Sequence, residues 1–366
     1  MKSCASKTGA LKSHALKTYS LKTYSLNNCS STKSPLHRLR AALVFSLLTA
    51  ATPGASMAAQ AGYEKHPGAA GFTARMLKKH GFSAPDVRAL LASARRQQSI
   101  LDAIARPAEK TRPWFEYRDI FLTERREREG VAFFRAHRET LARAQAETGV
   151  PAEIIVAIIG VETYYGRIAG NYRVLDALAT LAFDYPRRAA FFSRELENFL
   201  VLTREQGLDP LSLKGSYAGA MGYGQFMPSS YRAYAIDFDG DEQADIWNNP
   251  ADAIGSVANY LRRHGWRAGA PIVSAASARA GVDEALFDGK LKPRRTVAEF
   301  AAAGVSADPG LEPRALATAM RFELAQGYEY WLGLNNLYVI TRYNRSAMYA
   351  MSVYQLSQRI AAGVGG

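Results

Sequence analysis

Glu162 is the residue whose type and position most directly suggest acid–base chemistry. It lies in PAEIIVAIIGVETYYGR (151–167), which is almost wholly apolar and is expected to form a buried helix. In such a helix Glu162 shares a face with three isoleucines, Ile155, Ile158 and Ile159. A buried carboxyl group is costly unless it is protonated, paired or functional, and burial favours the protonated form that a general acid needs. The alternative is a structural carboxylate that pairs with Arg167 or caps a neighbour.

A second candidate is KGSYAGAMGYGQFMPSS (214–230), which has four glycines among polar and aromatic residues. Glycine lets the backbone approach a ligand closely. Ser216, Tyr223 and Gln225 could hydrogen-bond a polar ligand, and Phe226 and Met227 could form an apolar floor. The stretch has neither GxGxxG nor GK[ST], so it is not a phosphate cradle. The alternative is a tight connection between helices.

Alternating carboxylates from Asp237 onward indicate a cation site. Asp237, Asp239 and Asp241 occupy positions 1, 3 and 5 of an EF-hand-like loop, followed by Gln243 at position 7 and Asp245 at position 9. Glu242 stands where the motif has glycine, and Asn248 stands where it has a bidentate glutamate. Asp252 could supply the missing carboxylate. The alternative is a solvated acidic turn, but the mutual repulsion of three clustered carboxylates favours calcium.

Two further groups could bind an anionic or sugar ligand. Arg187 and Arg188 could clamp an anion, although they could also be surface residues bonded to carboxylates elsewhere. The segment from Asn335 interleaves tyrosines with amide and guanidinium groups, which suits stacking on sugars or bases. Its members are Tyr338, Tyr343, Asn344, Arg345, Tyr349 and Tyr354. For Tyr354 and Met351 the favoured interpretation is a helix core.

The chain has 366 residues, a net charge of +13 and a sequence pI of about 9.7, which could suggest nucleic acid or another polyanion as a partner. However, residues 1–61 hold eight basic residues and no acidic one, and residues 62–366 hold 38 basic and 33 acidic residues. The positive bias that remains in residues 62–366 is weak, and nucleic acid is not expected as a partner.

Both cysteines also precede residue 62, and no HExxH, GxSxG or catalytic cysteine pattern is present.

Residues 1–61 resemble a signal segment. Basic residues precede an apolar run (41–51), and small residues follow it, as in secretory signals. The run is too short for a stable membrane anchor, and no cysteine follows it for lipid attachment. We therefore expect export to the periplasm.

Hydrophobic periodicity in the rest of the chain favours helices. They are expected within 71–104, 124–147, 151–167, 185–206, 252–264 and 344–362. PIVSAAS, ATAMRFEL and YEYWLG, between residues 269 and 333, predict a small antiparallel sheet. The fold class is therefore mainly α, with a β insertion.

Together these motifs resemble the membrane-bound lytic murein transglycosylase B family, from about Phe72 to Leu356. The densest stretches are IIGVETYYGR, LDALATLAFDYPRR, LKGSYAGAMGYGQFMPSSYRAYAIDFDGD, WNNPADAIGSVANYLRRHGW and LYVITRYNRSAMYA. The resemblance implies a lysozyme-like helical core with an EF-hand-like calcium loop, an additional helical domain and a small β domain. The expected division is a signal segment (1–61) and a catalytic region (62–366), with a core at about 140–267, a β insertion at about 268–330 and a closing segment at 331–366.

The resemblance also implies roles for individual residues. Glu162 would be the catalytic acid and base. The glycan cleft would be lined by Tyr117, Arg187, Arg188, Ser216, Gln225, Phe226, Met227, Tyr343, Asn344 and Tyr349. Calcium would be held by Asp237, Asp239, Asp241, the Gln243 carbonyl and Asp252. No cofactor would be needed for the chemistry.

The implied reaction is cleavage of the β-1,4 bond between N-acetylmuramic acid and N-acetylglucosamine, with closure of a 1,6-anhydro ring instead of hydrolysis. A single carboxylate can then serve, whereas hydrolytic glycosidases usually need two. The alternatives are a hydrolytic lysozyme on the same fold and a catalytically silent wall-binding protein. The expected partner is the peptidoglycan glycan strand, and other cell-wall enzymes could join it.

Overall fold

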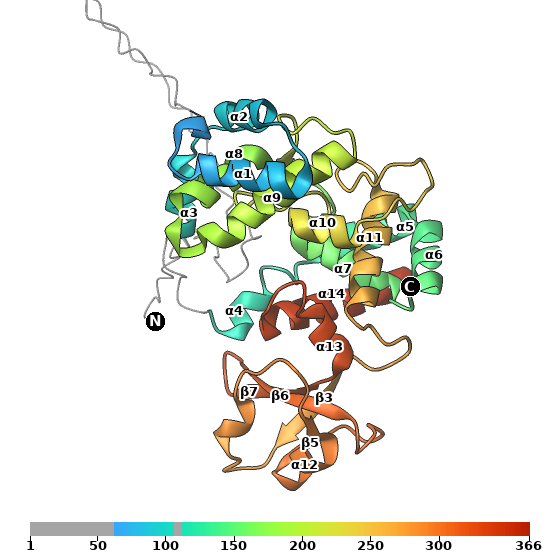
Figure 1. Cartoon of the computed structure of the whole chain (residues 1–366). Coiled ribbons are helices and arrows are strands. Elements are labelled where there is room, and N and C mark those ends of the chain that lie inside the picture. Colours follow the sequence, from blue (N-terminus) through green and yellow to red (C-terminus); the bar gives the residue numbers. More distant parts are fainter. Residues whose placement is uncertain (1–61, 106–111) are drawn as a thin grey trace, which may run out of the picture.

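The computed structural model describes residues 62–105 and 112–366. The expected signal segment (1–61) lies outside the described residues. The described chain is mainly helical, and a small antiparallel sheet lies at one end of the molecule (Figure 1). The fold class expected from the sequence is thus confirmed.

Fourteen α-helices are present among the described residues. They are α1 (Ala69–His80), α2 (Ala84–Ser93), α3 (Gln98–Ala105), α4 (Trp114–Arg118), α5 (Glu124–Ala136), α6 (Arg138–Thr148), α7 (Ala152–Thr163), α8 (Val174–Asp184), α9 (Ala189–Glu205), α10 (Pro228–Tyr234), α11 (Pro250–Arg263), α12 (Val297–Ala302), α13 (Asn335–Ile340) and α14 (Ala347–Gly365). Short 3₁₀ helices are η1 (Tyr63–Lys65), η2 (Pro186–Arg188) and η3 (Glu284–Phe287).

Two expected helices end or break earlier than their apolar patterns suggest. The charged helix expected over 124–147 is two helices, α5 and α6, because His137 leaves the helical conformation (φ −119°, ψ 27°). Helix α7 ends at Thr163 and not at Arg167, because Tyr164 and Tyr165 adopt left-handed backbone angles (φ 55° and 60°). Hydrophobic periodicity alone predicts neither the break at His137 nor the early end of α7.

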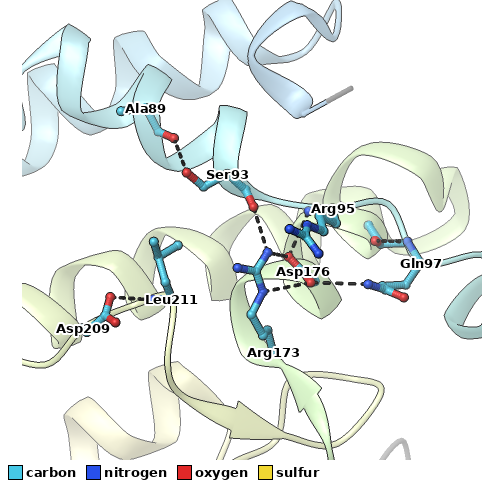
Figure 2. Close-up of polar contacts among 9 residues, drawn as sticks. Ala89, Ser93, Arg95, Gln97, Arg173, Asp176, Asp209 and Leu211 are labelled. Atoms are coloured by element: carbon cyan, nitrogen blue, oxygen red, sulfur yellow. Dashed lines mark hydrogen bonds and ion pairs between the residues drawn. The ribbon is translucent and has the colours of Figure 1, made fainter. Parts of the chain in front are cut away.

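The N-terminal helices are bonded to a largely buried ion pair at the start of α8 (Figure 2). Arg173 holds Asp176 with two hydrogen bonds, of 2.6 Å from Nη2 to Oδ1 and 3.0 Å from Nε to Oδ2. The same carboxylate accepts from the Arg95 backbone N–H at 2.8 Å, and Arg173 also donates to the Ser93 carbonyl at 2.7 Å. Asp176 is 3% exposed, so these bonds satisfy a carboxylate that would otherwise be costly to bury.

Helix α7 forms the centre of the remaining helical body. All its residues except Glu153 are buried, as expected for a helix that is apolar on every side. It contacts α5, α6, α11 and α14, and α14 returns from the far end of the chain to pack along it. Within the described ranges, none of the helices alone has the length and apolar character to span a bilayer; α6 and α7 together meet both criteria but are bent by 113°.

The C-terminal sheet has the antiparallel strand order β4-β6-β7-β3-β5. The strands are β3 (Val273–Ala278), β4 (Arg295–Thr296), β5 (Val305–Ala307), β6 (Leu316–Glu323) and β7 (Tyr328–Gly333). One face directs Met320 and Phe322 toward the helical body, where the Phe322 ring lies 5.0 Å from that of Trp114. The other face packs on α12 through Ala319 and Leu332. Two short strands, β1 (Tyr172–Arg173) and β2 (Lys214–Gly215), pair separately.

Candidate active site and acidic loop

Glu162 is the penultimate residue of α7 and is 7% exposed. Its Oε1 accepts a 2.7 Å hydrogen bond from the Tyr349 hydroxyl of α14. The pairing with Arg167 considered from the sequence is wrong, because Arg167 instead donates to Glu129 at 2.7 Å. The donor of this hydrogen bond is therefore a neutral group.

Buried tyrosines surround this carboxyl group. The pKa values of Tyr349 and Tyr343 are raised well above the ordinary tyrosine value. Burial is the largest cause, and the negative charge of Glu162 is the second. Tyrosine hydroxyls are ordinarily protonated at neutral pH, and the raised pKa keeps these two protonated to more alkaline pH. Tyr117, on α4, is also buried and lies close enough to Tyr349 to contribute to the rise in its pKa.

Aromatic rings extend from this point beneath the glycine-rich loop. The Tyr343 ring lies 4.5 Å from that of Tyr260 and 6.1 Å from that of Phe226, with tilted geometry. The Tyr260 hydroxyl donates to the Arg342 carbonyl at 2.7 Å. Sequence reasoning missed Tyr260, because its position on α11 shows no polar or glycine-rich signal that would distinguish it from a core residue.

Ser216 and Gln225 organise the glycine-rich loop from within. The Ser216 Oγ accepts from the backbone N–H of Ala220 at 3.0 Å. The Gln225 amide donates to the carbonyls of Gly222 and Ala169, each at 3.0 Å. Both side chains are fully buried, so their contacts fix the shape of the loop.

The neighbouring residues of this loop give it an apolar floor. Phe226 and Met227 are 1% and 9% exposed. The loop also lies against the backbone of Ile246, where a Cβ on Gly222 would lie 2.4 Å from the carbonyl oxygen. Close approach thus requires glycine here.

The surroundings of three further expected cleft residues differ: these are Asn344, Arg187 and Arg188. The Asn344 side-chain N–H₂ is buried and has no acceptor within the described chain. The Arg188 guanidinium stacks over Phe191 at 4.2 Å, and Arg187 is exposed on η2. Both arginines belong to η2, whereas Glu162 and Tyr349 belong to α7 and α14.

The acidic loop between α10 and α11 brings its carboxylates together. Asp237, Asp239, Asp241 and Asp252 each offer an oxygen, and these oxygens all lie within 4.8 Å of one another. Ca²⁺ binds oxygens at about 2.3–2.6 Å, so ligands on opposite sides of the ion lie about 5 Å apart. The geometry therefore fits calcium. Gln243 lies in the same loop and donates its backbone N–H to Asp241 at 2.9 Å.

Electrostatics within the loop also favour a cation. Asp252 is fully buried and accepts from the backbone N–H groups of Phe238 and Asp245, at 2.7 and 2.8 Å. Burial is the largest influence on its pKa, which is raised, and the nearby charges of Asp239 and Asp237 add to the rise. A bound cation would relieve this repulsion.

Glu242 occupies the loop position that the EF-hand pattern gives to glycine. Its φ is 73°, the left-handed conformation that glycine adopts most easily. Glu242 therefore adopts the backbone conformation typical of glycine, which is strained for an L-residue.

Comparisons with known proteins agree with this architecture. The family model described as Transglycosylase SLT domain matches residues 64–358. Membrane-bound lytic murein transglycosylase B of Escherichia coli (strain K12) is 45% identical over 308 residues, which cover 82% of this chain and 84% of that protein.

Two solved structures are similar over most of the chain. Catenated lytic transglycosylase SltB1 from Pseudomonas aeruginosa has 54% identity and a TM-score of 0.81, covering 83% of this chain and 100% of that one. Escherichia coli lytic transglycosylase Slt35 in complex with calcium has 44% identity and a TM-score of 0.77, covering 84% and 97%. The chain belongs to the transglycosylase SLT domain family.

Proposed function

We propose that this protein is a peptidoglycan lytic transglycosylase in which Glu162 acts as both acid and base. It would cleave the β-1,4 bond between N-acetylmuramic acid and N-acetylglucosamine and form 1,6-anhydro-N-acetylmuramic acid. Family membership supports the reaction class. The observation that carries the residue assignment is the buried hydrogen bond between Tyr349 and Glu162.

The other buried carboxylates of the described chain have structural partners. Asp176 and Glu197 pair with Arg173 and Arg75, Glu195 accepts from the Ser229 backbone and hydroxyl, and Asp252 belongs to the acidic loop. Glu162 differs in its setting, because it accepts from the Tyr349 hydroxyl at the end of α7, among the buried tyrosines of the candidate cleft. A buried carboxyl group that keeps its own proton is suited to general-acid catalysis.

The Tyr349 hydrogen bond also selects which oxygen carries the proton. Because Oε1 accepts from the phenol, Oε2 is the oxygen that would carry the proton when Glu162 is in its acid form. Glu162 would donate that proton to the glycosidic oxygen as the bond to C1 of the muramic residue breaks. Its position in the last turn of α7, at the negative end of the helix dipole, further favours the neutral form before reaction.

Ring closure returns the proton. The muramic C6 hydroxyl oxygen bonds to C1, and its proton passes to the Glu162 carboxylate, so the enzyme ends in its starting state. No water is consumed. This balance explains how one carboxylate can serve where hydrolases commonly use two.

The cleft residues would position the glycan around this carboxyl group. Ser216 and Gln225 would do so by shaping the loop, and Phe226 and Met227 by forming its apolar floor. Tyr117, Tyr343 and Asn344 would contribute aromatic and amide surface. Arg187 and Arg188, farther along the chain, would contact anionic groups of the strand.

Calcium is proposed as a structural ion. Asp237, Asp239, Asp241, Asp252 and the Gln243 carbonyl would hold it and so brace the loop between α10 and α11. It would take no part in bond cleavage.

Export to the periplasm by residues 1–61 remains a proposal from the sequence. Release there without a stable membrane anchor would bring the enzyme to its polymer, and other cell-wall enzymes could act with it. Nucleic acid is not a proposed partner.

Digestion of purified sacculi followed by mass spectrometry tests the function. Ring closure gives anhydro-muropeptides, whereas a lysozyme would give products heavier by one water. Binding to sacculi without any soluble product would instead identify a catalytically silent wall-binding protein.

A further inference from the structure

The chain leaves α7 through a strained turn directly after Glu162. Tyr164, Tyr165 and Gly166 have consecutive positive φ values of 55°, 60° and 86°. Glycine adopts such angles readily, whereas tyrosine does so only when its surroundings compensate for the steric cost. Within the described ranges, four non-glycine residues have positive φ, and the other two, Gln225 and Glu242, lie in the glycine-rich and acidic loops. Strain of this kind tends to accumulate at functional sites.

The Tyr165 side chain joins this turn to two helices. Its hydroxyl donates to the Arg126 carbonyl of α5 at 2.8 Å. Its ring fills the space left by two glycines. A Cβ on Gly160 of α7 would lie 2.6 Å from the ring, and one on Gly130 of α5 would lie 2.5 Å from the hydroxyl. The ring therefore fits between α5 and α7 only because both positions are glycine.

The Arg126 side chain holds the preceding tyrosine. Its buried guanidinium lies over the Tyr164 ring, 4.6 Å from the centroid, and also donates to the Ile120 carbonyl. Such contacts stabilise a cation and a ring together when water is excluded. Both left-handed tyrosines are thus fixed by one residue of α5, through its backbone and its side chain.

The turn is also bonded to the loop that lines the candidate cleft. Thr163 donates from Oγ1 to the Tyr223 carbonyl at 2.9 Å and accepts from the Gly166 N–H at 3.0 Å. A Cβ on Gly166 would lie 2.2 Å from the Tyr223 ring. Any rotation of the turn would therefore displace the glycine-rich loop as well as the last turn of α7.

We propose that Tyr165 is a positioning residue, whose ring and hydroxyl fix the left-handed end of α7 and thereby aim the Glu162 carboxyl group at the reacting bond. This inference rests on the proposed function of Glu162. Tyr165 touches no substrate in this scheme. It acts by keeping the end of α7, the glycine-rich loop and α5 in a single arrangement.

The test compares Tyr165→Leu and Tyr165→Phe with the wild-type protein on soluble, uncrosslinked peptidoglycan strands. A misaligned acid lowers turnover and leaves ground-state binding intact, so we expect Tyr165→Leu to lower kcat by about 30-fold with KM within about twofold. Tyr165→Phe keeps the ring and loses one hydrogen bond, so kcat should fall about threefold. The alkaline limb of the kcat–pH profile should also move in Tyr165→Leu, because the surroundings of Glu162 change.

Tyr63→Leu provides a matched control. Tyr63 is also a buried tyrosine with a hydrogen-bonded hydroxyl, donated to Asp184 at 2.5 Å, but it lies among the N-terminal helices. Its loss should lower the thermal midpoint and leave kcat and its pH profile unchanged. If Tyr165→Leu behaves in the same way, Tyr165 is only structural and the inference fails.

Two outcomes separate this inference from the proposed function. If Tyr165→Leu does not fold, the inference is tested by Tyr165→Phe alone. A kcat and a kcat–pH profile of Tyr165→Phe identical to those of wild type would then overturn the inference. If the wild-type protein itself releases no anhydro-muropeptides, it is the proposed function that fails, along with any inference built on it.

Discussion

The Tyr349 hydroxyl donates to Oε1 of Glu162 across 2.7 Å, and both side chains are buried. The two residues are 187 positions apart in the sequence and belong to α14 and α7. The C-terminal helix is thereby part of the site, and not merely a closing element. The burial that keeps Tyr349 protonated also makes its hydrogen bond expensive to lose.

Tyr349→Phe should lower the rate of anhydro-muropeptide release about tenfold, because Oε1 of Glu162 would lose its donor in a buried site. Tyr354→Phe is the matched control, since Tyr354 lies on the same helix and is only partly buried. Initial rates at saturating substrate measure the effect. Equal rates for the two variants would contradict the role given to Tyr349.

Asp176→Ala should lower the free energy of unfolding by about 3 kcal/mol, because Arg173 would lose its partner in a largely buried pair. Activity per folded molecule should be retained, since the pair fastens the N-terminal helices and lies outside the candidate site. Asp209→Ala, also in Figure 2, removes an exposed carboxylate that accepts from the Leu211 N–H and should have a small effect. Chemical denaturation measures both; similar losses would refute the buried-pair account.

Glu242→Gly should raise the free energy of unfolding in saturating calcium by about 1 kcal/mol relative to Glu242→Ala. Both variants remove the same charge, but only glycine relieves the left-handed strain at φ 73°. Chelation of calcium should lower the thermal midpoint of each protein. No difference between the two variants would mean that the turn stores no strain.

His264 should make stability depend on pH in the acidic range. Burial lowers its pKa below 6.5, so the unfolded chain binds a proton before the folded one does. The contribution of neutral His264 to the free energy of unfolding is therefore complete above pH 6.5. It is lost as the pH falls from there through the lower pKa of the folded state. His264→Phe keeps the ring stacked 4.1 Å from that of Tyr260 and removes the titration.

The thermal midpoint of His264→Phe should consequently fall less than that of wild type between pH 7 and pH 5. Parallel decreases in the two proteins would show that this histidine does not carry the dependence. Measurements at constant calcium keep the acidic loop from contributing a difference.

The sequence was sufficient to predict the helix that bears Glu162 and the carboxylates of the acidic loop. Both are local: an uninterrupted apolar run predicts burial, and carboxylates at alternate loop positions converge without help from distant residues. The three longer strands of the sheet were predicted for the same reason, from short apolar runs bounded by turns.

The sequence could not predict the end of α7 or the partner of Glu162. The residues Tyr164 and Tyr165 continue a helical pattern, and contacts with α5 help to hold them in left-handed conformations. Tyr349 was a candidate for the cleft, but its bond to Glu162 depends on how α14 packs against α7. Packing between segments so far apart in the sequence cannot be predicted from the hydrophobic periodicity of either segment.

The most direct test of the account is the release of anhydro-muropeptides from sacculi by Glu162→Gln. Glu153→Gln, an equivalent change in the first turn of the same helix, is the control. Loss of the proton donor should lower the rate by about 10²- to 10⁴-fold in Glu162→Gln, and Glu153→Gln should retain the wild-type rate. Anhydro products formed by Glu162→Gln at the wild-type rate would contradict the central role of this carboxyl group.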